Sequence, residues 1–414
     1  MLNWANQFNI CVLLDNHQYN FKHHHVECLL AVNAVNTFQA TENVLPQLKH
    51  FCNHTNDWLF GHVAYSFKNH LFNTTASTHN DAIGFPDLFF FQPETVIQLQ
   101  QGHVVIACIE SNPATVFEEI VNHKSTTANT PFQAVEIKPK ISRSDYLSII
   151  HQLQQHILRG DCYEINFCQE FFAENTGIDA VDVFNQLSAV SPNPFSCYYK
   201  LADKYLLCAS PERYIKKTGS NIISQPIKGT FKRDVANAMA DAALKNQLYN
   251  SQKDRSENVM VVDLVRNDLS KVCKEGTVQV DELFGIYSFP QVHQMISTIS
   301  GELNDDVDLA DVLLATFPMG SMTGAPKKRV MELIDEYEQS NRGIYSGCVG
   351  YISPEKDYDF NVVIRSIMYN QTNQYISYQV GGGITFYSDA EKEYEECLLK
   401  AEAMEAVLQK KAAL

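Results

Sequence analysis

The sequence predicts a protein of mixed α-helices and β-strands, and three features support this prediction. The chain has 414 residues, of which 45% are hydrophobic, so it is long enough to bury a large core. Its first third contains short runs rich in aromatic and aliphatic side chains, which favour strands. Its last two thirds also contain segments whose apolar residues recur at helical spacing. Spacing alone therefore predicts a mixture of α and β, but not how the sheets pack.

Residues 1–135 form the first predicted region, and we expect its strands to join the main body of the protein. The composition becomes polar from residue 122 to residue 130, which indicates a loop or a boundary. Residues 136–414 form the second region, which carries the motifs described below. The strands predicted in the first region cover residues 8–14, 58–61, 88–91 and 104–109.

Composition excludes several classes of function. The net charge of −16 argues against a nucleic-acid surface, because phosphate binding needs clustered Lys and Arg. The eleven cysteines are scattered and include no Cys-x-x-Cys pair, which is typical of a reduced cytosolic chain. No basic-then-apolar signal segment is present, and no apolar run approaches the roughly 18 residues of a membrane span. We expect a soluble, cytoplasmic protein.

Three consecutive histidines, His23, His24 and His25, suggest a metal site at first sight. Consecutive residues cannot all face one point in regular structure, and no acidic or cysteine partner lies nearby in the sequence. A solvated turn is therefore the preferred interpretation.

A helix is predicted after residue 143, followed by a strand. Ser144 and Asp145 can cap the helix, and Gly160 would end it. The strand covers residues 163–168 and alternates polar with apolar side chains, so Glu164 and Asn166 share one face.

Two further helices each carry a pair of carboxylates. Ser251 can cap a helix that runs to about residue 269, in which Asp254 and Glu257 are three residues apart and face the same way. A capping box at residues 388–391 opens the other helix, which presents Glu393 and Glu396 at the same spacing. Two such pairs suit a hard cation bound through oxygen.

The stretch around Lys228 constrains its backbone on both sides. Pro226 restricts the approach, and Gly229 permits conformations that are closed to other residues. Taken alone, this pattern also fits an ordinary turn lysine. Upstream, Glu212 follows Ser-Pro; it is either a surface residue or a general acid whose pKa burial would have to raise.

The order of these motifs from about residue 141 to the C-terminus resembles the chorismate-utilising enzymes. That family includes anthranilate synthase large subunits, aminodeoxychorismate synthase component I, and isochorismate and salicylate synthases. The resemblance rests on the segments containing Glu212, Lys228, Asp254 and Glu257, on residues 318–327, and on residues 381–396. It implies an α+β fold of two packed antiparallel β-sheets flanked by helices, with the site between them.

The resemblance also implies a reaction. A lysine in Pro-Ile-Lys-Gly-Thr is typical of the aminodeoxychorismate synthases, which aminate chorismate at C4 on the way to p-aminobenzoate and folate. The chain has no Gly-x-Cys-x-Gly elbow, so we expect ammonia itself, or a separate glutamine amidotransferase subunit, to supply the nitrogen.

By resemblance, each site residue has an expected role. Lys228 would be the nucleophile and Glu212 the acid. Glu257 and Glu396 would bind Mg²⁺ directly, and Asp254 and Glu393 would bind it mainly through water. The expected substrate-binding residues are Arg365 (placed in a strand over residues 361–366), Tyr345, Gly383, Ser321 and His293.

Other functions remain as alternatives. Anthranilate synthases typically carry alanine in place of Lys228. At the position of Glu164 the family usually has glutamine, and isochorismate synthases have a lysine there, so the glutamate counts against isochorismate synthesis. A non-catalytic chorismate-binding paralogue is a different class of protein, disfavoured by the full acidic set. The loop at residues 320–327 does not have the Gly-x-x-x-x-Gly-Lys-[Ser/Thr] spacing of a nucleotide-binding loop, so ATP binding is rejected.

Overall fold

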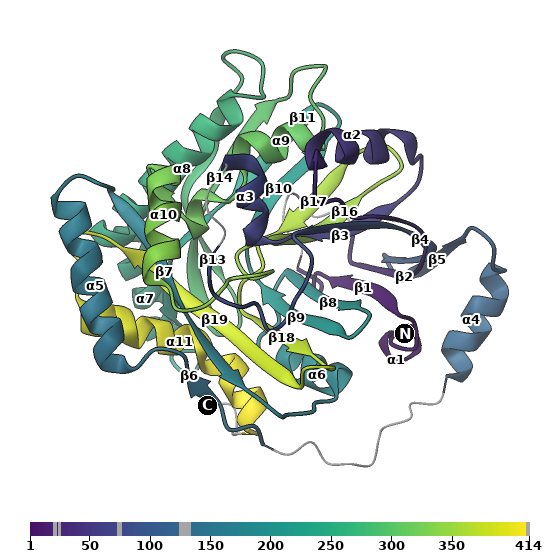
Figure 1. The fold of residues 1–414 in the computed structure, drawn as a ribbon, viewed down its shortest axis with the longest axis horizontal. Coiled ribbons are helices and arrows are strands. Elements are labelled where there is room, and N and C mark those ends of the chain that lie inside the picture. Colours follow the sequence, from purple (N-terminus) through teal and green to yellow (C-terminus); the bar gives the residue numbers. More distant parts are fainter. Residues whose placement is uncertain (20–22, 24–25, 73–76, 124–133, 411–414) are drawn as a thin grey trace.

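The structure is a computed structural model, and Figure 1 shows its ribbon. It describes residues 1–414 except 20–22, 24–25, 73–76, 124–133 and 411–414. His24, His25 and most of the polar stretch predicted at 122–130 lie outside the described residues. In the part of the chain that the structure describes, no helix combines the length and the apolar character needed to cross a bilayer.

The strands form one antiparallel network with two arms. One arm runs β7–β19–β18–β9–β8–β1–β2 and the other β3–β16–β17–β10–β11–β14. The long strand β4 pairs with β2, β3 and β5 and so joins the arms. The bounds are β1 Ile10–Asp15, β2 Cys28–Phe38, β3 Leu59–Val63, β4 Leu88–Gln100, β5 His103–Cys108, β6 Lys138–Pro139, β7 Glu164–Ala173, β8 Phe195–Leu201, β9 Lys204–Ser210, β10 Arg213–Thr218, β11 Asn221–Gln225, β12 Ile227–Lys232, β13 Gln279–Ser288, β14 Val292–Glu302, β15 Gly324–Ala325, β16 Cys348–Ile352, β17 Tyr358–Asn361, β18 Ser366–Asn370 and β19 Tyr375–Ile384.

Helices lie outside these strands (Figure 1). The predicted α+β class with antiparallel sheets is confirmed, although the two arms are joined through β2 and β4. The helix bounds are α1 Leu2–Ala5, α2 Val44–His54, α3 Lys68–Phe72, α4 Pro113–Asn122, α5 Arg143–Leu158, α6 Ala180–Val190, α7 Ala238–Asn250, α8 Gln252–Ser270, α9 Leu309–Thr316, α10 Lys327–Tyr337 and α11 Ala390–Gln409, with short 3₁₀ turns η1 Tyr65–Phe67 and η2 Gly320–Met322.

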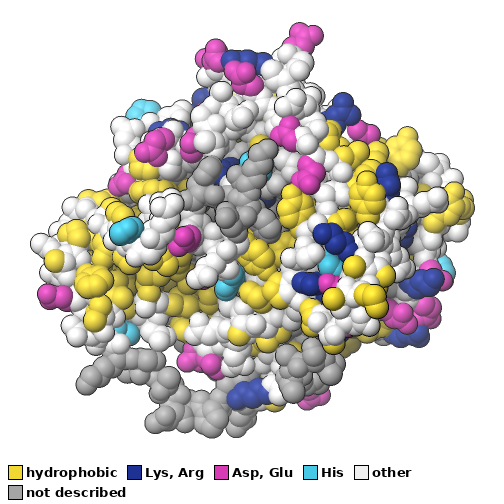
Figure 2. All heavy atoms as spheres, turned by 180° about the vertical axis from the view of Figure 1, so that it is seen from behind, with side chains coloured by type: hydrophobic (Ala, Val, Ile, Leu, Met, Phe, Trp, Pro, Cys, Tyr) yellow, Lys and Arg dark blue, Asp and Glu magenta, His cyan; other side chains and the backbone are white. Residues whose placement is uncertain are grey.

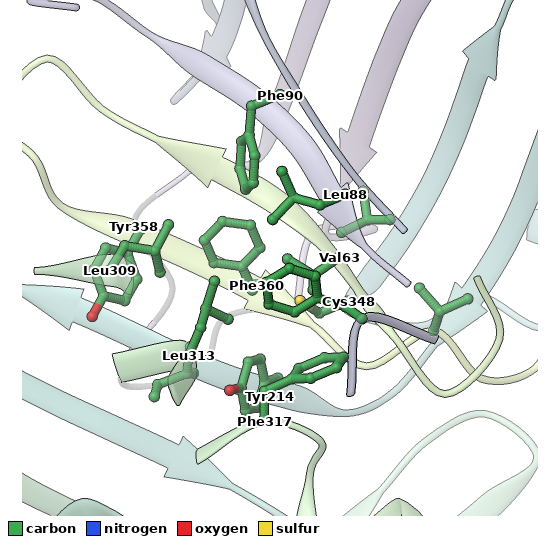
Figure 3. Packing of buried hydrophobic residues seen from close by; sticks show 14 of the residues in the cluster. Val63, Leu88, Phe90, Tyr214, Leu309, Leu313, Phe317, Cys348, Tyr358 and Phe360 are labelled. Carbon is green, nitrogen blue, oxygen red and sulfur yellow. The ribbon is translucent and has the colours of Figure 1, made fainter. Parts of the chain in front are cut away.

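The largest hydrophobic cluster fills the space between the two arms. Figure 3 shows part of it, where side chains from β3, β4, β10, β16, β17 and α9 point toward one another. Phe90 and Phe360 are almost fully buried there, with ring centroids 6.1 Å apart in an edge-on contact. A second cluster lies where α6 and α11 cover β9, β18 and β19. Burial of this much apolar surface holds the arms together and fixes the strands that carry the site.

Strands from the first 135 residues lie inside this network. β1 pairs with β8, and β3 pairs with β16. These contacts link the N-terminal region to strands that follow residue 190 in the chain.

The two helices that carry paired carboxylates form where the sequence predicts them. Ser251 caps α8 through the backbone N–H of Asp254, and α8 ends at Ser270. In α11 the cap is Asp389, whose carboxylate accepts from the backbone N–H groups of residues 391 and 392. Ser388, which opens the predicted capping box, instead accepts from the backbone N–H of Thr385.

Two predicted local features are wrong. Ser142, not Ser144, caps α5, because its hydroxyl accepts from the backbone N–H of Asp145. Arg365 does not lie in a strand: β17 ends at Asn361 and β18 begins at Ser366. Arg365 has a φ of 51°, a left-handed conformation that interrupts a ladder.

Figure 2 shows the face opposite the view of Figure 1. Hydrophobic side chains gather in patches among the described residues of that face, and acidic and basic side chains lie around them in small groups.

Candidate active site

A cavity lies between β7, β12, β14 and β19 on one side and α8 and α11 on the other, with about 840 Å³ of empty space when its opening to solvent is included. Its lining is rich in charged side chains, unlike the hydrophobic space between the arms. The chain segments that reach it are far apart in sequence, and pairing of β12 with β14 and of β7 with β19 brings several of them together. The site residues predicted from the sequence that line this cavity are Glu212, Lys228, Asp254, Glu257, Ser321, Tyr345, Arg365, Gly383, Glu393 and Glu396.

One side of the cavity, here called the paired wall, consists of Glu212, Ser321, Lys228 and Glu164. All four are buried, with exposed fractions of 1–8%. The hydroxyl of Ser321 donates to Oε1 of Glu212 at 2.6 Å. The ammonium of Lys228 donates to Oε1 of Glu164 at 2.6 Å. Each charged group in this wall therefore has a partner within hydrogen-bond distance.

Glu212 has the electrostatic property expected of a general acid. Burial raises its pKa to about 7, although the hydrogen bond from Ser321 and the nearby Lys228 act in the opposite direction. A carboxyl group with such a pKa carries a proton in a large fraction of molecules near neutral pH.

Lys228 is held charged by its surroundings. Burial lowers its pKa, but the carboxylates of Glu164 and Glu257 outweigh burial, so the pKa lies above its usual value. Glu164 lies behind the cavity lining, and its second oxygen, Oε2, is buried without a hydrogen-bond partner among the described residues. Glu164 is therefore positioned to accept a proton from the ammonium of Lys228.

Gly383 makes room for this pair. A Cβ at residue 383 would overlap Oε1 of Glu164 and lie 2.8 Å from Nζ of Lys228. The residue next to it, Gly382, points toward the opposite wall, where a Cβ would meet Oε2 of Glu393 at an ordinary 3.4 Å. A side chain at residue 383 would therefore displace the Lys228–Glu164 pair, and this close approach, not backbone conformation, favours glycine.

A buried ion pair supports the paired wall from behind. Arg342 bonds to Glu338 and also donates to the backbone carbonyls of Met322 and Asn166. The side-chain amide of Asn166 in turn donates to the carbonyl of Ser321. These bonds fix the loop that carries Ser321 against β7, as expected for a preorganised site.

The other side of the cavity, here called the carboxylate wall, consists of Asp254 and Glu257 from α8 and Glu393 and Glu396 from α11. The i, i+3 spacing predicted from the sequence places each pair on the cavity side of its helix. Burial raises the pKa of Glu257, and its Oε1 is buried without a hydrogen-bond partner among the described residues.

Two lysines lie in the carboxylate wall. Lys253 Nζ is 2.8 Å from Glu393 Oε1, and Lys400 Nζ is 2.8 Å from Glu396 Oε1. The charge of Lys400 holds the pKa of Glu396 down at about 2. This wall is more open than the paired wall, since the Lys253 and Glu396 side chains are 45% and 42% exposed.

The donor set of the carboxylate wall fits a hard divalent cation by its chemistry. It offers only carboxylate oxygens, including the unpartnered Oε1 of Glu257, and these are the ligands that Mg²⁺ prefers. The oxygens do not converge to ligand distances: no group of three or more His, Cys, Asp or Glu close enough to hold a metal occurs among the described residues.

Arg365 and Tyr345 are available to an anionic ligand. Arg365 lines the cavity, and burial lowers its pKa to about 10 while Glu212 acts in the opposite direction. It remains a cation at neutral pH, with a planar fork suited to a carboxylate. The hydroxyl of Tyr345 is buried, 3.7 Å from the sulfur of Cys168.

His293 is the predicted site residue that the structure does not bring into the cavity. Its ring bonds to Asp241 and Ser288 on the other face of β14. The next residue, Gln294, lines the cavity instead, and its buried Oε1 has no partner among the described residues. Successive side chains of a strand face opposite ways, so a shift of one residue exchanges the two faces.

The prediction also missed Lys253, Lys400 and Asn166 as cavity residues. The two lysines had a detectable signal: each is four residues from a predicted carboxylate, Glu257 or Glu396, and so lies on the same face of its helix. Asn166 had one too, because it shares a strand face with Glu164.

The arrangement combines three chemical capacities in one cavity. The paired wall offers a proton donor and a buried amine with a proton acceptor. The carboxylate wall offers hard oxygen ligands. Arg365 offers a fixed positive charge. Together these suit a small, anionic substrate from which a hydroxyl group leaves.

Comparisons with known proteins agree with this chemistry. The sequence profile of a family described as chorismate binding enzyme matches residues 6–406. The chain is 36% identical to aminodeoxychorismate synthase component 1 of Salmonella typhimurium over 76% of its own length and 68% of that protein. It is 40% identical to the Escherichia coli protein of the same name over 65% of its own length and 59% of that protein. These alignments span about two thirds or less of the relatives' lengths.

A solved structure supports the fold over almost the whole chain. Anthranilate synthase component I from Streptococcus pneumoniae superposes with a TM-score of 0.80 at 26% identity, covering 94% of this chain and 96% of that one.

Proposed function

Because this chain belongs to the chorismate binding enzyme family, we propose that it is an aminodeoxychorismate synthase, which replaces the C4 hydroxyl of chorismate with an amino group. The observation that carries this proposal is Lys228, an amine buried in the cavity beside a carboxylate acceptor and on the same wall as the protonatable Glu212. The names of the relatives with 36% and 40% identity support the same reaction.

The first step uses three residues of the paired wall, Lys228, Glu164 and Glu212. Lys228 must lose a proton before it can attack, and Glu164 is the acceptor at hydrogen-bond distance. Its free amine adds to C2 of chorismate, the ring double bond shifts, and the C4–oxygen bond breaks. Glu212 gives the departing oxygen its proton, so water leaves.

In the second step ammonia adds to C4. The double bond shifts back, and the bond between C2 and the protonated secondary amine of Lys228 breaks, which releases Lys228 as a neutral amine. The nitrogen now bound to C4 then loses its extra proton. The enolpyruvyl group is retained throughout. Dividing one displacement into two steps is the usual gain of covalent catalysis.

The remaining cavity residues bind and orient the substrate. Chorismate has two carboxylates, and we assign one to Arg365 with Tyr345 and Ser321 nearby. A Mg²⁺ ion held by Glu257 and Glu396, with Asp254 and Glu393 bonding through water, would supply a positive charge for the other. His293 has no role in this scheme, because its side chain faces away from the cavity.

Product identification tests the proposal and separates it from the alternatives. Purified protein is incubated with chorismate, Mg²⁺ and ammonium, and the product is identified by mass and absorbance. We expect aminodeoxychorismate. Anthranilate would identify an anthranilate synthase, an activity named for the similar solved structure. Isochorismate, or no turnover, would also overturn the proposal.

We further propose that a separate glutamine amidotransferase supplies ammonia in the cell, because the relatives are named component 1. Free ammonium should then support turnover by the purified chain, whereas glutamine should not. Glutamine-dependent turnover by the purified chain alone would contradict this assignment.

A further inference from the structure

Lys253 lies at the centre of the carboxylate wall. It is in the first turn of α8, four residues before Glu257, and its side chain reaches across to α11. Its Nζ is 2.8 Å from an oxygen of Glu393, 3.9 Å from one of Glu257 and 4.0 Å from one of Glu396. One ammonium thus lies within 4.0 Å of three of the four carboxylates.

No other cation of this wall has that position. Lys400 is held by two close contacts, because its Nζ lies 2.8 Å from Oε1 of Glu396 and donates to the backbone carbonyl of Gly381 at 2.8 Å. Lys253 has one close bond, to Glu393, and its other two carboxylate contacts are too long for hydrogen bonds. Its side chain is 45% exposed, so it can leave without disrupting the core.

An ammonium and a divalent cation compete for the same oxygens. Mg²⁺ binds carboxylate oxygens at about 2.0–2.1 Å. The ammonium of Lys253 lies 3.9 Å from an oxygen of Glu257 and 4.0 Å from one of Glu396, so an ion on these two residues would lie next to a charge of the same sign. The Oε1 of Glu257, buried and without a hydrogen bond, is the ligand position that Lys253 approaches but does not satisfy.

We propose that Lys253 is an internal counter-cation of the carboxylate wall, which a divalent cation displaces into solvent on binding. This inference rests on the metal site of the proposed function and adds a residue that sets its affinity. Without the ion, Lys253 neutralises carboxylates that would otherwise repel one another across α8 and α11. With the ion bound, the metal neutralises these carboxylates instead.

The inference predicts opposite effects of one substitution on stability and on metal affinity. Lys253→Met removes the competing charge, so Mg²⁺ should bind at least about tenfold more tightly by titration calorimetry. The same variant should unfold at a lower temperature in EDTA than the wild type, because its carboxylates have lost their counter-cation. Lys253→Gln should behave in the same direction if Lys253→Met folds poorly.

Lys392→Met is the matched control. Lys392 lies next to Glu393 in the sequence, but it is exposed and is not within ion-pair distance of the carboxylate wall among the described residues. Its removal changes the net charge equally, so it should change Mg²⁺ affinity much less. A Lys253→Met variant that binds Mg²⁺ no more tightly than Lys392→Met would overturn the proposal.

Chemical labelling tests displacement in the unaltered protein. Lysine acetylation followed by peptide mass spectrometry should show Lys253 becoming more reactive when Mg²⁺ is added to metal-free protein, with Lys392 unchanged. Equal or lower labelling of Lys253 would contradict displacement. Mg²⁺ affinity, unfolding temperature and lysine labelling do not depend on the product formed. A protein that made anthranilate would therefore overturn the proposed function and leave this inference intact.

Discussion

The two walls of the cavity stabilise their charged side chains in different ways. In the paired wall each charge has its own partner at 2.6 Å and is almost fully buried. In the carboxylate wall two lysines contact three of the four carboxylates, and part of the wall is open to solvent. Buried charges need fixed partners, whereas exposed ones can exchange theirs. This difference supports the proposed roles, in which the paired wall transfers protons and the carboxylate wall binds an ion.

The largest expected effect comes from removing the amine of the paired wall. Lys228→Arg keeps the positive charge but provides no nucleophile, so we expect aminodeoxychorismate formation to fall by at least about 10³-fold. Lys228→Ala should do the same. Chromatographic product assays measure both. Near-normal turnover by the arginine variant would reduce Lys228 to an electrostatic role.

Replacing the acid of the same wall should also be severe. Glu212→Gln retains the shape and a hydrogen bond to Ser321 but cannot donate a proton to the leaving oxygen. We expect kcat to fall about 10²–10⁴-fold, the usual contribution of general acid catalysis. A variant within threefold of the wild type would exclude Glu212 as the acid.

Removing the divalent ion addresses the carboxylate wall. From the proposed Mg²⁺ site we expect excess EDTA to abolish turnover and to lower the unfolding temperature, because the ion would bind the folded protein and offset the carboxylate charges. Adding Mg²⁺ back should restore both. Full turnover in excess EDTA would contradict the assignment of this wall to a metal.

Substitutions at two adjacent glycines of β19 compare how tightly the two walls are packed. Gly383→Ala places a methyl group against the Lys228–Glu164 pair, so we expect a loss of about 1–3 kcal/mol in unfolding free energy and a large loss of activity. Gly382→Ala is the matched control, because its methyl group meets the carboxylate wall at ordinary contact distance. Denaturant unfolding measures both. Equal effects would show that the walls do not differ in tightness.

The smallest effect should be a shift in pH dependence. Protonated Glu212 is the active form, so kcat/KM should fall as pH rises through about 7. The Ser321 hydrogen bond lowers the pKa of Glu212, and Ser321→Ala should therefore move this decline to higher pH. A decline that stays in place, or moves to lower pH, would contradict the assignment.

The sequence predicted the carboxylate wall better than the paired wall for a geometrical reason. Helix periodicity is local, so spacings of three residues in α8 and α11 placed both carboxylate pairs correctly. The Lys228–Glu164 contact joins residues 64 positions apart in the chain, and nothing local indicates it. Motif order supplied Lys228, but not its partner.

The clearest wrong predictions concern residues in or next to strands. Whether His293 or Gln294 faces the cavity depends on a register of one residue. β12 and β13 are both irregular against β14, with register shifts on each side. Arg365 was placed in a strand because its neighbours are apolar, whereas its left-handed backbone ends the ladder and turns the side chain into the cavity.

Trapping the covalent state of Lys228 tests the central claim most directly. The wild-type protein is mixed with chorismate and Mg²⁺ without ammonium, quenched rapidly, and digested for mass spectrometry. We expect the peptide containing Lys228 to gain the mass of chorismate less one water, and to lose it when ammonium is added and aminodeoxychorismate appears. The Lys228→Arg protein should show no such gain. Formation of aminodeoxychorismate by the wild type with no adduct at any quench time, together with turnover by the arginine variant, would contradict the account.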